Sequence, residues 1–220
     1  MSESSTEAHT PELLADELVE PTITDSSVVY DGMVWSVRKE QFSYDDKPIN
    51  REFVDHTGAV AVLAMDDDER ILLIKQYRHP IRAREWELPA GLLDVTGEDP
   101  VVGAQRELAE EVDLVASRWD LLTDFQTSPG GSNEAIRVYL ARGLSDAPEA
   151  FARYDEEANI EKRWVSFDEV IEAVLARRVQ NSILAIAALA ADASRSRGWS
   201  TLADARTPWT RHPLFRPSAT

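Results

Sequence analysis

A helical periodicity that begins at Pro100 constrains the fold more than any other feature of the chain. Proline suits the first position of a helix, because the N–H that it lacks would have no partner there. After it, apolar residues recur at helical spacing, at Val101, Ala104, Leu108 and Val112. This stripe predicts an amphipathic helix whose apolar face packs against another layer of the protein.

Carboxylates crowd one edge of the same predicted helix. Glu107 and Glu111 are one turn apart, Glu110 lies three residues from Glu107, and Glu98 precedes the helix. Like charges at this spacing repel each other. One interpretation is a solvated acidic face, because most charge runs are solvated. The other is a site for Mg²⁺ or Mn²⁺, which would relieve the repulsion and which bind hard oxygen ligands where phosphates are handled.

The chain divides by composition into four parts. Residues 1–26 hold seven acidic residues and no lysine or arginine, which is typical of a disordered acidic tail. Residues 27–57 contain short alternating β-prone runs and predict a small antiparallel sheet. We expect residues 58–195 to form the main domain and residues 196–220 to form a C-terminal extension.

The main domain is predicted to be an α/β structure. Two apolar runs, 59–65 and 71–77, flank a turn-forming Asp-Asp-Asp-Glu-Arg segment and predict a buried hairpin. Further strands and helices are predicted after the Pro100 helix, with strands at 119–125, 135–141 and 161–166 and helices at 167–176 and 182–193. This order fits an α/β/α sandwich with a mixed sheet.

Composition and charge limit the possible partners. The 220 residues include 43% hydrophobic residues, enough for one sizeable core, and no cysteine, so no disulfide or thiolate metal site can form. A formal net charge of −17 argues against a partner with a phosphate backbone, so we expect no nucleic acid. With no long apolar run and no signal-like start, we expect no membrane association and a cytoplasmic protein.

Basic residues gather directly before the acidic helix. Arg78, His79, Arg82 and Arg84 fall within seven residues of an otherwise acidic chain. They could be ordinary surface residues. Beside a metal site, however, an arginine is the side chain expected to hold a diphosphate, because its guanidinium group bonds two phosphate oxygens at once.

The stretch from Gly91 to Leu114 resembles the Nudix box, which has a glycine, a spaced glutamate and then Arg-Glu-aliphatic-x-Glu-Glu-x-Gly-aliphatic. Seven residues separate Glu98 from Arg106, as in that pattern. Two positions depart from it: six residues rather than five separate Gly91 from Glu98, and Asp113 replaces the glycine. Aspartate tolerates the left-handed conformation that a helix terminus often needs, so the second departure is mild.

Within that family the chain resembles the ADP-ribose pyrophosphatases, through the segments 76–79 and 86–91 and through Pro129. The resemblance implies a Nudix α/β/α sandwich and hydrolysis of ADP-ribose, a nucleoside diphosphate, to AMP and ribose 5-phosphate by metal-activated water. It also implies two or three Mg²⁺ ions, or Mn²⁺, in each active site. The alternative substrates are other nucleoside diphosphate sugars, GDP-mannose or UDP-glucose. A Nudix-like transcriptional regulator is disfavoured, because the box glutamates are complete and the C-terminal extension is short.

The resemblance also implies the metal ligands. They are the carbonyl oxygen of Ala90 and the carboxylates of Glu107 and Glu111. Glu110 is a lesser candidate, and Glu98 is either a partial ligand or a residue that holds a ligand in place.

The same resemblance implies the catalytic groups. Glu157, with Glu156 as the second choice, would act as the base from a loop that could swing over the metal ions. Arg106 and Glu110 are the other two residues implied to be catalytic.

Four residues are implied to bind the substrate. Arg78 would hold the diphosphate and Glu134 the terminal ribose. Arg51 and Glu52 in the early sheet match residues that reach the ligand in the site of the partner subunit, so the resemblance also implies a homodimer.

Overall fold

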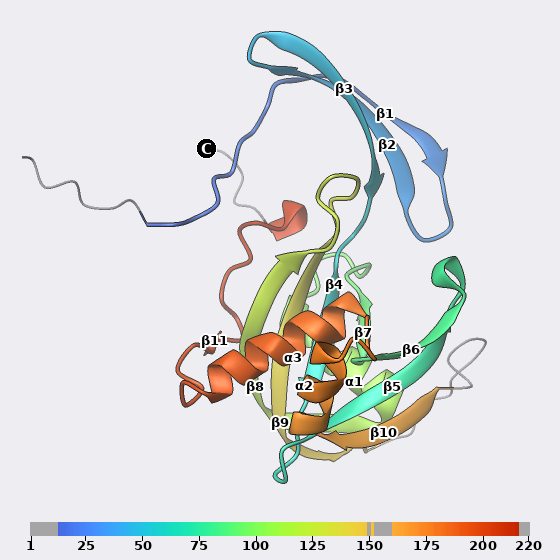
Figure 1. The fold of residues 1–220 in the computed structure, drawn as a ribbon. Helices are drawn as coiled ribbons and strands as arrows, with labels where there is room; N and C mark the ends of the chain where they lie inside the picture. Colours follow the sequence, from blue (N-terminus) through green and yellow to red (C-terminus); the bar gives the residue numbers. More distant parts are fainter. Residues whose placement is uncertain (1–12, 149–150, 152–159, 216–220) are drawn as a thin grey trace, which may run out of the picture.

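The computed structural model describes residues 13–148, 151 and 160–215 (Figure 1). Its elements in chain order are β1 (Ile23–Asp31), β2 (Ser36–Tyr44), β3 (Lys47–Asp55), β4 (Ala59–Ala64), β5 (Arg70–Arg78), η1 (His79–Ile81), β6 (Ala83–Glu87), β7 (Ala90–Leu92), α1 (Pro100–Val112), β8 (Leu114–Gln126), β9 (Ala135–Asp146), β10 (Glu161–Ser166), α2 (Phe167–Leu175), α3 (Ser182–Arg195), β11 (Ala203–Asp204) and η3 (Pro213–Phe215). Within these ranges we find no helix with the length and apolar character needed to cross a membrane.

Strands β1, β2 and β3 form the predicted N-terminal antiparallel sheet. Most of the sheet stands away from the rest of the protein (Figure 1), but the end of β3 contacts the loop before β9, where the N–H of Val54 donates to the carbonyl of Gly131 over 2.9 Å. Its first strand begins at Ile23, so residues 23–26, which were predicted to belong to the acidic tail, are part of the sheet. The boundary predicted at residue 26 is therefore wrong by four residues, because Ile23 pairs with Phe42 of β2.

The main sheet is mixed, as predicted. Its order is β11-β8-β9-β4-β7, with β4 parallel to β9 and the other pairs antiparallel. The central strand β4 is buried at every position, which explains its continuous apolar sequence: both faces of this strand are covered.

The predicted hairpin between the first two apolar runs is wrong. Strand β5 belongs to a second sheet of order β10-β5-β6, and a single bridge between Met65 and Ile71 joins the two runs. The turn itself forms, since the Asp66 carboxylate accepts hydrogen bonds from the backbone N–H groups of Asp68 and Arg70. Strand β4 is already paired along both edges, by β7 and by β9, so β5 must find other partners.

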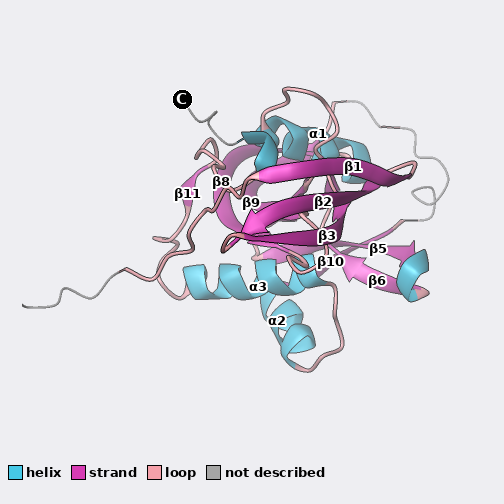
Figure 2. Cartoon of the chain, turned by 90° about the horizontal axis from the view of Figure 1, so that it is seen from above, coloured by secondary structure: helices cyan, strands magenta, loops and turns pink. Residues whose placement is uncertain are grey.

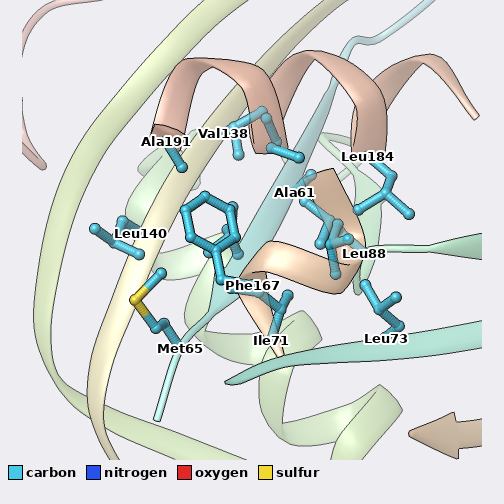
Figure 3. Packing of buried hydrophobic residues seen from close by; sticks show 14 of the residues in the cluster. Ala61, Met65, Ile71, Leu73, Leu88, Val138, Leu140, Phe167, Leu184 and Ala191 are labelled. Carbon is cyan, nitrogen blue, oxygen red and sulfur yellow. The ribbon is translucent and has the colours of Figure 1, made fainter. Parts of the chain in front are cut away.

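Helices cover both faces of the main sheet and complete the α/β/α sandwich. Helix α1 lies on one side, and α2 and α3 lie on the other (Figure 2). Residues of β4 alternate between the two cores: Ala61 packs with Phe167 and Leu184 of α2 and α3 (Figure 3), whereas Val62 packs with Leu108 of α1. The two helices predicted after the last long strand are confirmed as α2 and α3.

The C-terminal extension packs against the main domain. Strand β11 pairs with β8 at the edge of the main sheet. Trp209 is buried against the α1 core, and its ring lies under the guanidinium group of Arg137, 4.7 Å from the ring centroid. Arg206 reaches Asp99 at the start of α1, with 2.6 Å between Nη1 and Oδ2.

Candidate active site

Helix α1 begins and ends as its sequence predicts. The Asp99 side chain accepts a hydrogen bond from the N–H of Val101, and Pro100 occupies the first turn. The predicted apolar stripe is buried. At the other end Asp113 adopts the left-handed conformation, with φ 61° and ψ 35°, in the place where the Nudix pattern has glycine. Asp113 therefore caps the helix in the conformation that glycine usually adopts at this position.

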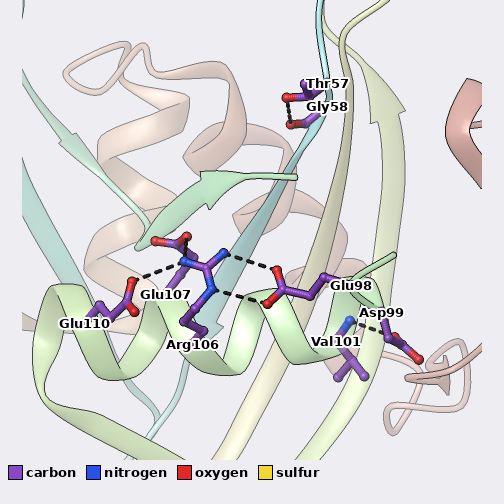
Figure 4. Close-up of polar contacts among 8 residues, drawn as sticks. All are labelled: Thr57, Gly58, Glu98, Asp99, Val101, Arg106, Glu107 and Glu110. Carbon is purple, nitrogen blue, oxygen red and sulfur yellow. Dashed lines mark hydrogen bonds and ion pairs between the residues drawn. The ribbon is translucent and has the colours of Figure 1, made fainter. Parts of the chain in front are cut away.

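Arg106 lies among three carboxylates at the edge of α1 (Figure 4). Its Nε and Nη2 donate to the two oxygens of Glu98 over 3.3 and 3.2 Å, and its Nη1 donates to Glu107 and Glu110. These hydrogen bonds and charges raise the pKa of Arg106 further above its ordinary value, with the Glu98 hydrogen bond as the largest contribution. Arg106 thus fixes the orientation of the carboxylates and offsets their repulsion.

The side chains of Glu107 and Glu111 reach neighbouring residues of β7. The backbone N–H of Ala90 donates to Glu111 Oε2 over 2.9 Å. A Cβ atom at residue 91 would overlap the carboxyl group of Glu107, so glycine at this position lets the carboxylate pack against the strand. Glu111 is only 6% exposed and the Glu107 side chain only 13%, so a solvated acidic face does not describe them.

Burial also changes the charge balance at Glu107. Desolvation raises the pKa of this carboxyl above its ordinary value, and the charge and hydrogen bond of Arg106 only partly oppose that effect. A second cation near Glu107 would favour its charged form.

Two carboxylates, those of Glu107 and Glu111, lie against the backbone of β7. Among the described residues, no three histidine, aspartate or glutamate side chains converge closely enough to hold a metal ion by themselves. Glu107 and Glu111 lie against β7, where the backbone of Ala90 carries a carbonyl oxygen. These hard oxygen donors fit Mg²⁺, which usually takes one or two carboxylates and keeps several waters.

A pocket of about 500 Å³ adjoins the same edge of β7. Its walls include Ala90 and Gly91 together with Arg78, Glu87 and Glu134. The guanidinium group of Arg78 forms two hydrogen bonds with Glu87, Nε to Oε1 over 2.9 Å and Nη2 to Oε2 over 2.6 Å. Glu87 is almost fully buried. Arg78 is thus held in one orientation at the pocket wall.

Glu134 stands on the wall of this pocket, directly before β9. Thr127 Oγ1 donates to Glu134 Oε2 over 2.6 Å, and Nε2 of His56 lies 3.5 Å from Oε1. Arg78, Ala90 and Glu134 thus line one pocket, although they come from different parts of the sequence.

Other predicted site residues lie elsewhere. Arg51 and Glu52 are exposed on β3, where Arg51 donates to the carbonyl of Asn50 and Glu52 lies 4.0 Å from Lys39, and neither lines the pocket. Glu156 and Glu157 fall outside the described residues.

The residues that line the pocket without having been predicted include Glu87, Asn181 and His56. Glu87 holds Arg78, and its place in the Trp-Glu-Leu-Pro-Ala-Gly segment was the only sequence signal for it. Asn181 caps α3 and also lines the pocket, as does His56. Nothing local in the sequence indicates either residue, because each reaches the pocket only through tertiary packing.

The fold and this carboxylate-edged helix define a Nudix protein. The NUDIX domain profile matches residues 55–186, and the chain belongs to that family. It is 43% identical to the ADP-ribose pyrophosphatase of Mycobacterium tuberculosis strain H37Rv, over 86% of this chain and 90% of the relative. It is 36% identical to the ADP-ribose pyrophosphatase of Bacillus subtilis strain 168, over 77% of this chain and 91% of the relative. A crystal structure of an ADP compounds hydrolase shares the fold, with a TM-score of 0.67 over 88% of this chain and 100% of that chain, at 19% identity.

Proposed function

We propose that the chain hydrolyses the diphosphate bond of ADP-ribose to give AMP and ribose 5-phosphate. The observation that carries this proposal is the pocket, in which Arg78 and Glu134 share a wall with the part of β7 that touches Glu107 and Glu111. A diphosphate group, a sugar and a divalent cation would each have a matching group within one cavity. The names of the two bacterial relatives support the same substrate.

Mg²⁺, or Mn²⁺ in its place, is the proposed cofactor, with two or three ions in each site. Glu107, Glu111 and the carbonyl of Ala90 would hold it. Glu110 is a lesser ligand, and Glu98 acts mainly through Arg106, because both of its oxygens accept from that guanidinium group. The bound cations supply charge neutralisation for the diphosphate oxygens and a lower pKa for the attacking water.

Two side chains in the pocket would position the substrate. Arg78 carries the positive charge and the planar donor group that suit a diphosphate, and Glu87 keeps that group in place. Glu134 presents a carboxylate that accepts hydrogen bonds from two neighbouring ribose hydroxyls. For the base we propose Glu157, or else Glu156, which rests on the family resemblance. The cytoplasmic location stays a prediction from the sequence.

The substrate assignment predicts a ranking. Among ADP-ribose, GDP-mannose, UDP-glucose, NADH, diadenosine polyphosphates and 8-oxo-dGTP at equal concentration, we expect ADP-ribose to give the highest kcat/KM. Glu134→Ala should narrow that lead, because a site built to bond two hydroxyls discriminates against groups that lack them. If GDP-mannose or UDP-glucose is preferred by about tenfold, the alternative substrate class is correct. If none of these compounds is hydrolysed, the alternative of a Nudix-like transcriptional regulator is favoured.

A homodimer would complete the site. Arg51 and Glu52 lie outside the pocket of their own chain, and the N-terminal sheet that carries them exposes large apolar side chains, including Val28, Val29 and Tyr30. Apolar surface of this kind is typical of an interface. A second copy that packs on this sheet would cover it and would bring Arg51 and Glu52 towards a neighbouring pocket.

Sedimentation should therefore give about twice 24.6 kDa. A complementation experiment tests the shared site directly. Arg51→Ala and Glu111→Gln variants, each weakly active alone, should regain activity when mixed and allowed to exchange subunits, because one site of the mixed dimer then has both native residues. A fully active monomer, or a mixture that gains no activity, would contradict the proposal.

A further inference from the structure

The Glu134 carboxylate is held from two sides by residues that have so far been given no role. Thr127 donates its hydroxyl hydrogen to Oε2, and the His56 ring faces Oε1 with 3.5 Å between Nε2 and that oxygen. His56 and Glu134 both line the pocket, and the His56 side chain is only 11% exposed. This arrangement lies in the substrate pocket and not at the surface.

The hydrogen bonds of His56 fix which ring nitrogen carries the proton. The backbone N–H of Gly58 donates to Nδ1 over 2.9 Å, so Nδ1 acts as an acceptor. In the neutral imidazole the proton must then lie on Nε2, the nitrogen that faces Glu134. The neutral ring, which accepts from Gly58 at Nδ1, is therefore a donor towards the carboxylate.

The backbone around His56 is fastened to the loop that carries Glu134. The N–H of His56 donates to Asn133 Oδ1 over 2.7 Å, and the N–H of Asn133 donates to the carbonyl of Val54 over 3.2 Å. Val54 in turn donates to the carbonyl of Gly131 over 2.9 Å. These hydrogen bonds thus fix the distance between the His56 ring and the Glu134 carboxylate.

We propose that His56 is a positioning residue that orients the Glu134 carboxylate for the terminal ribose. This inference rests on the proposed function, because it assumes that Glu134 binds the sugar. An ionised carboxylate has about four acceptor positions. With one occupied by Thr127 on Oε2 and one facing His56 on Oε1, each oxygen keeps a position for one ribose hydroxyl. His56 thereby contributes to the preference for a vicinal diol without contacting the diphosphate.

Two substitutions separate the two ring nitrogens. In His56→Asn the amide oxygen replaces Nδ1 and keeps the bond from Gly58, but the donor towards Glu134 is lost. In His56→Gln the amide nitrogen replaces Nε2 and keeps that donor. We expect His56→Asn to raise KM for ADP-ribose about tenfold with little change in kcat, and His56→Gln to restore most of the loss. Thermal unfolding of each variant checks that the fold is retained.

A double-mutant cycle shows whether His56 acts through Glu134. In the Glu134→Ala background, His56→Asn should change KM no further. The inference is overturned if His56→Asn adds its full effect there, if His56→Gln resembles His56→Asn, or if Glu134→Ala alone leaves KM unchanged. Failure of the proposed function looks different: wild-type protein would then prefer another nucleoside diphosphate, and the same cycle run with that compound still decides whether the two residues are coupled.

Discussion

Removal of divalent cations with a chelator is expected to abolish hydrolysis of ADP-ribose, and added Mg²⁺ is expected to restore it. The physical reason is the arrangement at β7, where desolvation raises the pKa of Glu107 and the charge and hydrogen bond of Arg106 only partly oppose that rise. A dianionic substrate entering that region would add further negative charge to a place where the charges of Glu110 and Asp94 already raise the pKa of Glu107. Release of AMP, followed by chromatography, measures the effect.

The control for the chelation experiment is the thermal stability of the protein with and without chelator. Hydrogen bonds to Arg106 and to Ala90 hold Glu98, Glu107, Glu110 and Glu111 without a metal ion, so the chelated protein should unfold at a similar temperature. Loss of activity together with a large loss of stability would mean that the cation supports the fold instead of the reaction. Full activity in excess chelator would contradict the assignment of a metal site altogether.

Local sequence rules predicted the helix that carries the candidate metal-binding carboxylates, but not the pocket beside it. The spacing of apolar residues placed α1 correctly, and helical geometry then placed Glu107 and Glu111 one turn apart. Even the departure at Asp113 could be interpreted from backbone preferences, since aspartate tolerates the left-handed conformation observed there. These features depend on neighbours within a few residues.

Features that depend on distant neighbours were missed. The β4 and β5 runs look like a hairpin in sequence, but the edges of β4 are taken by strands that follow later in the chain. His56 meets Glu134 across 78 residues, a contact that no local pattern encodes. The sequence also allowed a solvated acidic face on α1. That interpretation does not hold for Glu107 and Glu111, because both pack against β7, a strand that the helix sequence alone does not indicate.

Exposure explains why the three helix glutamates need separate treatment. By sequence they form one acidic cluster, yet Glu111 is buried against Ala90 whereas the Glu110 side chain is 40% exposed. Charge repulsion alone does not rank them. Their exposure to solvent does rank them as metal ligands. A carboxylate that is partly removed from water gains more from a nearby cation than one that stays solvated.

Glu111→Gln is accordingly expected to lower kcat by about three powers of ten while leaving the fold intact. Glutamine keeps an oxygen that can accept the Ala90 N–H, so the hydrogen bond between α1 and β7 survives. The substitution removes only the negative charge that a metal ion would require. Steady-state kinetics at saturating Mg²⁺, with thermal unfolding measured in parallel, separates the loss of charge from any loss of structure.

The matched control is Glu110→Gln, the same chemical change one residue away. Glu110 contacts Arg106 but is far more exposed, so its substitution should cost no more than about tenfold in kcat. Glu111→Gln should also need a higher Mg²⁺ concentration to reach half of its own maximal activity, because a weakened ligand set binds the ion less tightly. If Glu110→Gln and Glu111→Gln have equal effects, burial against β7 does not select the metal ligands, and the assignment of Glu111 is wrong.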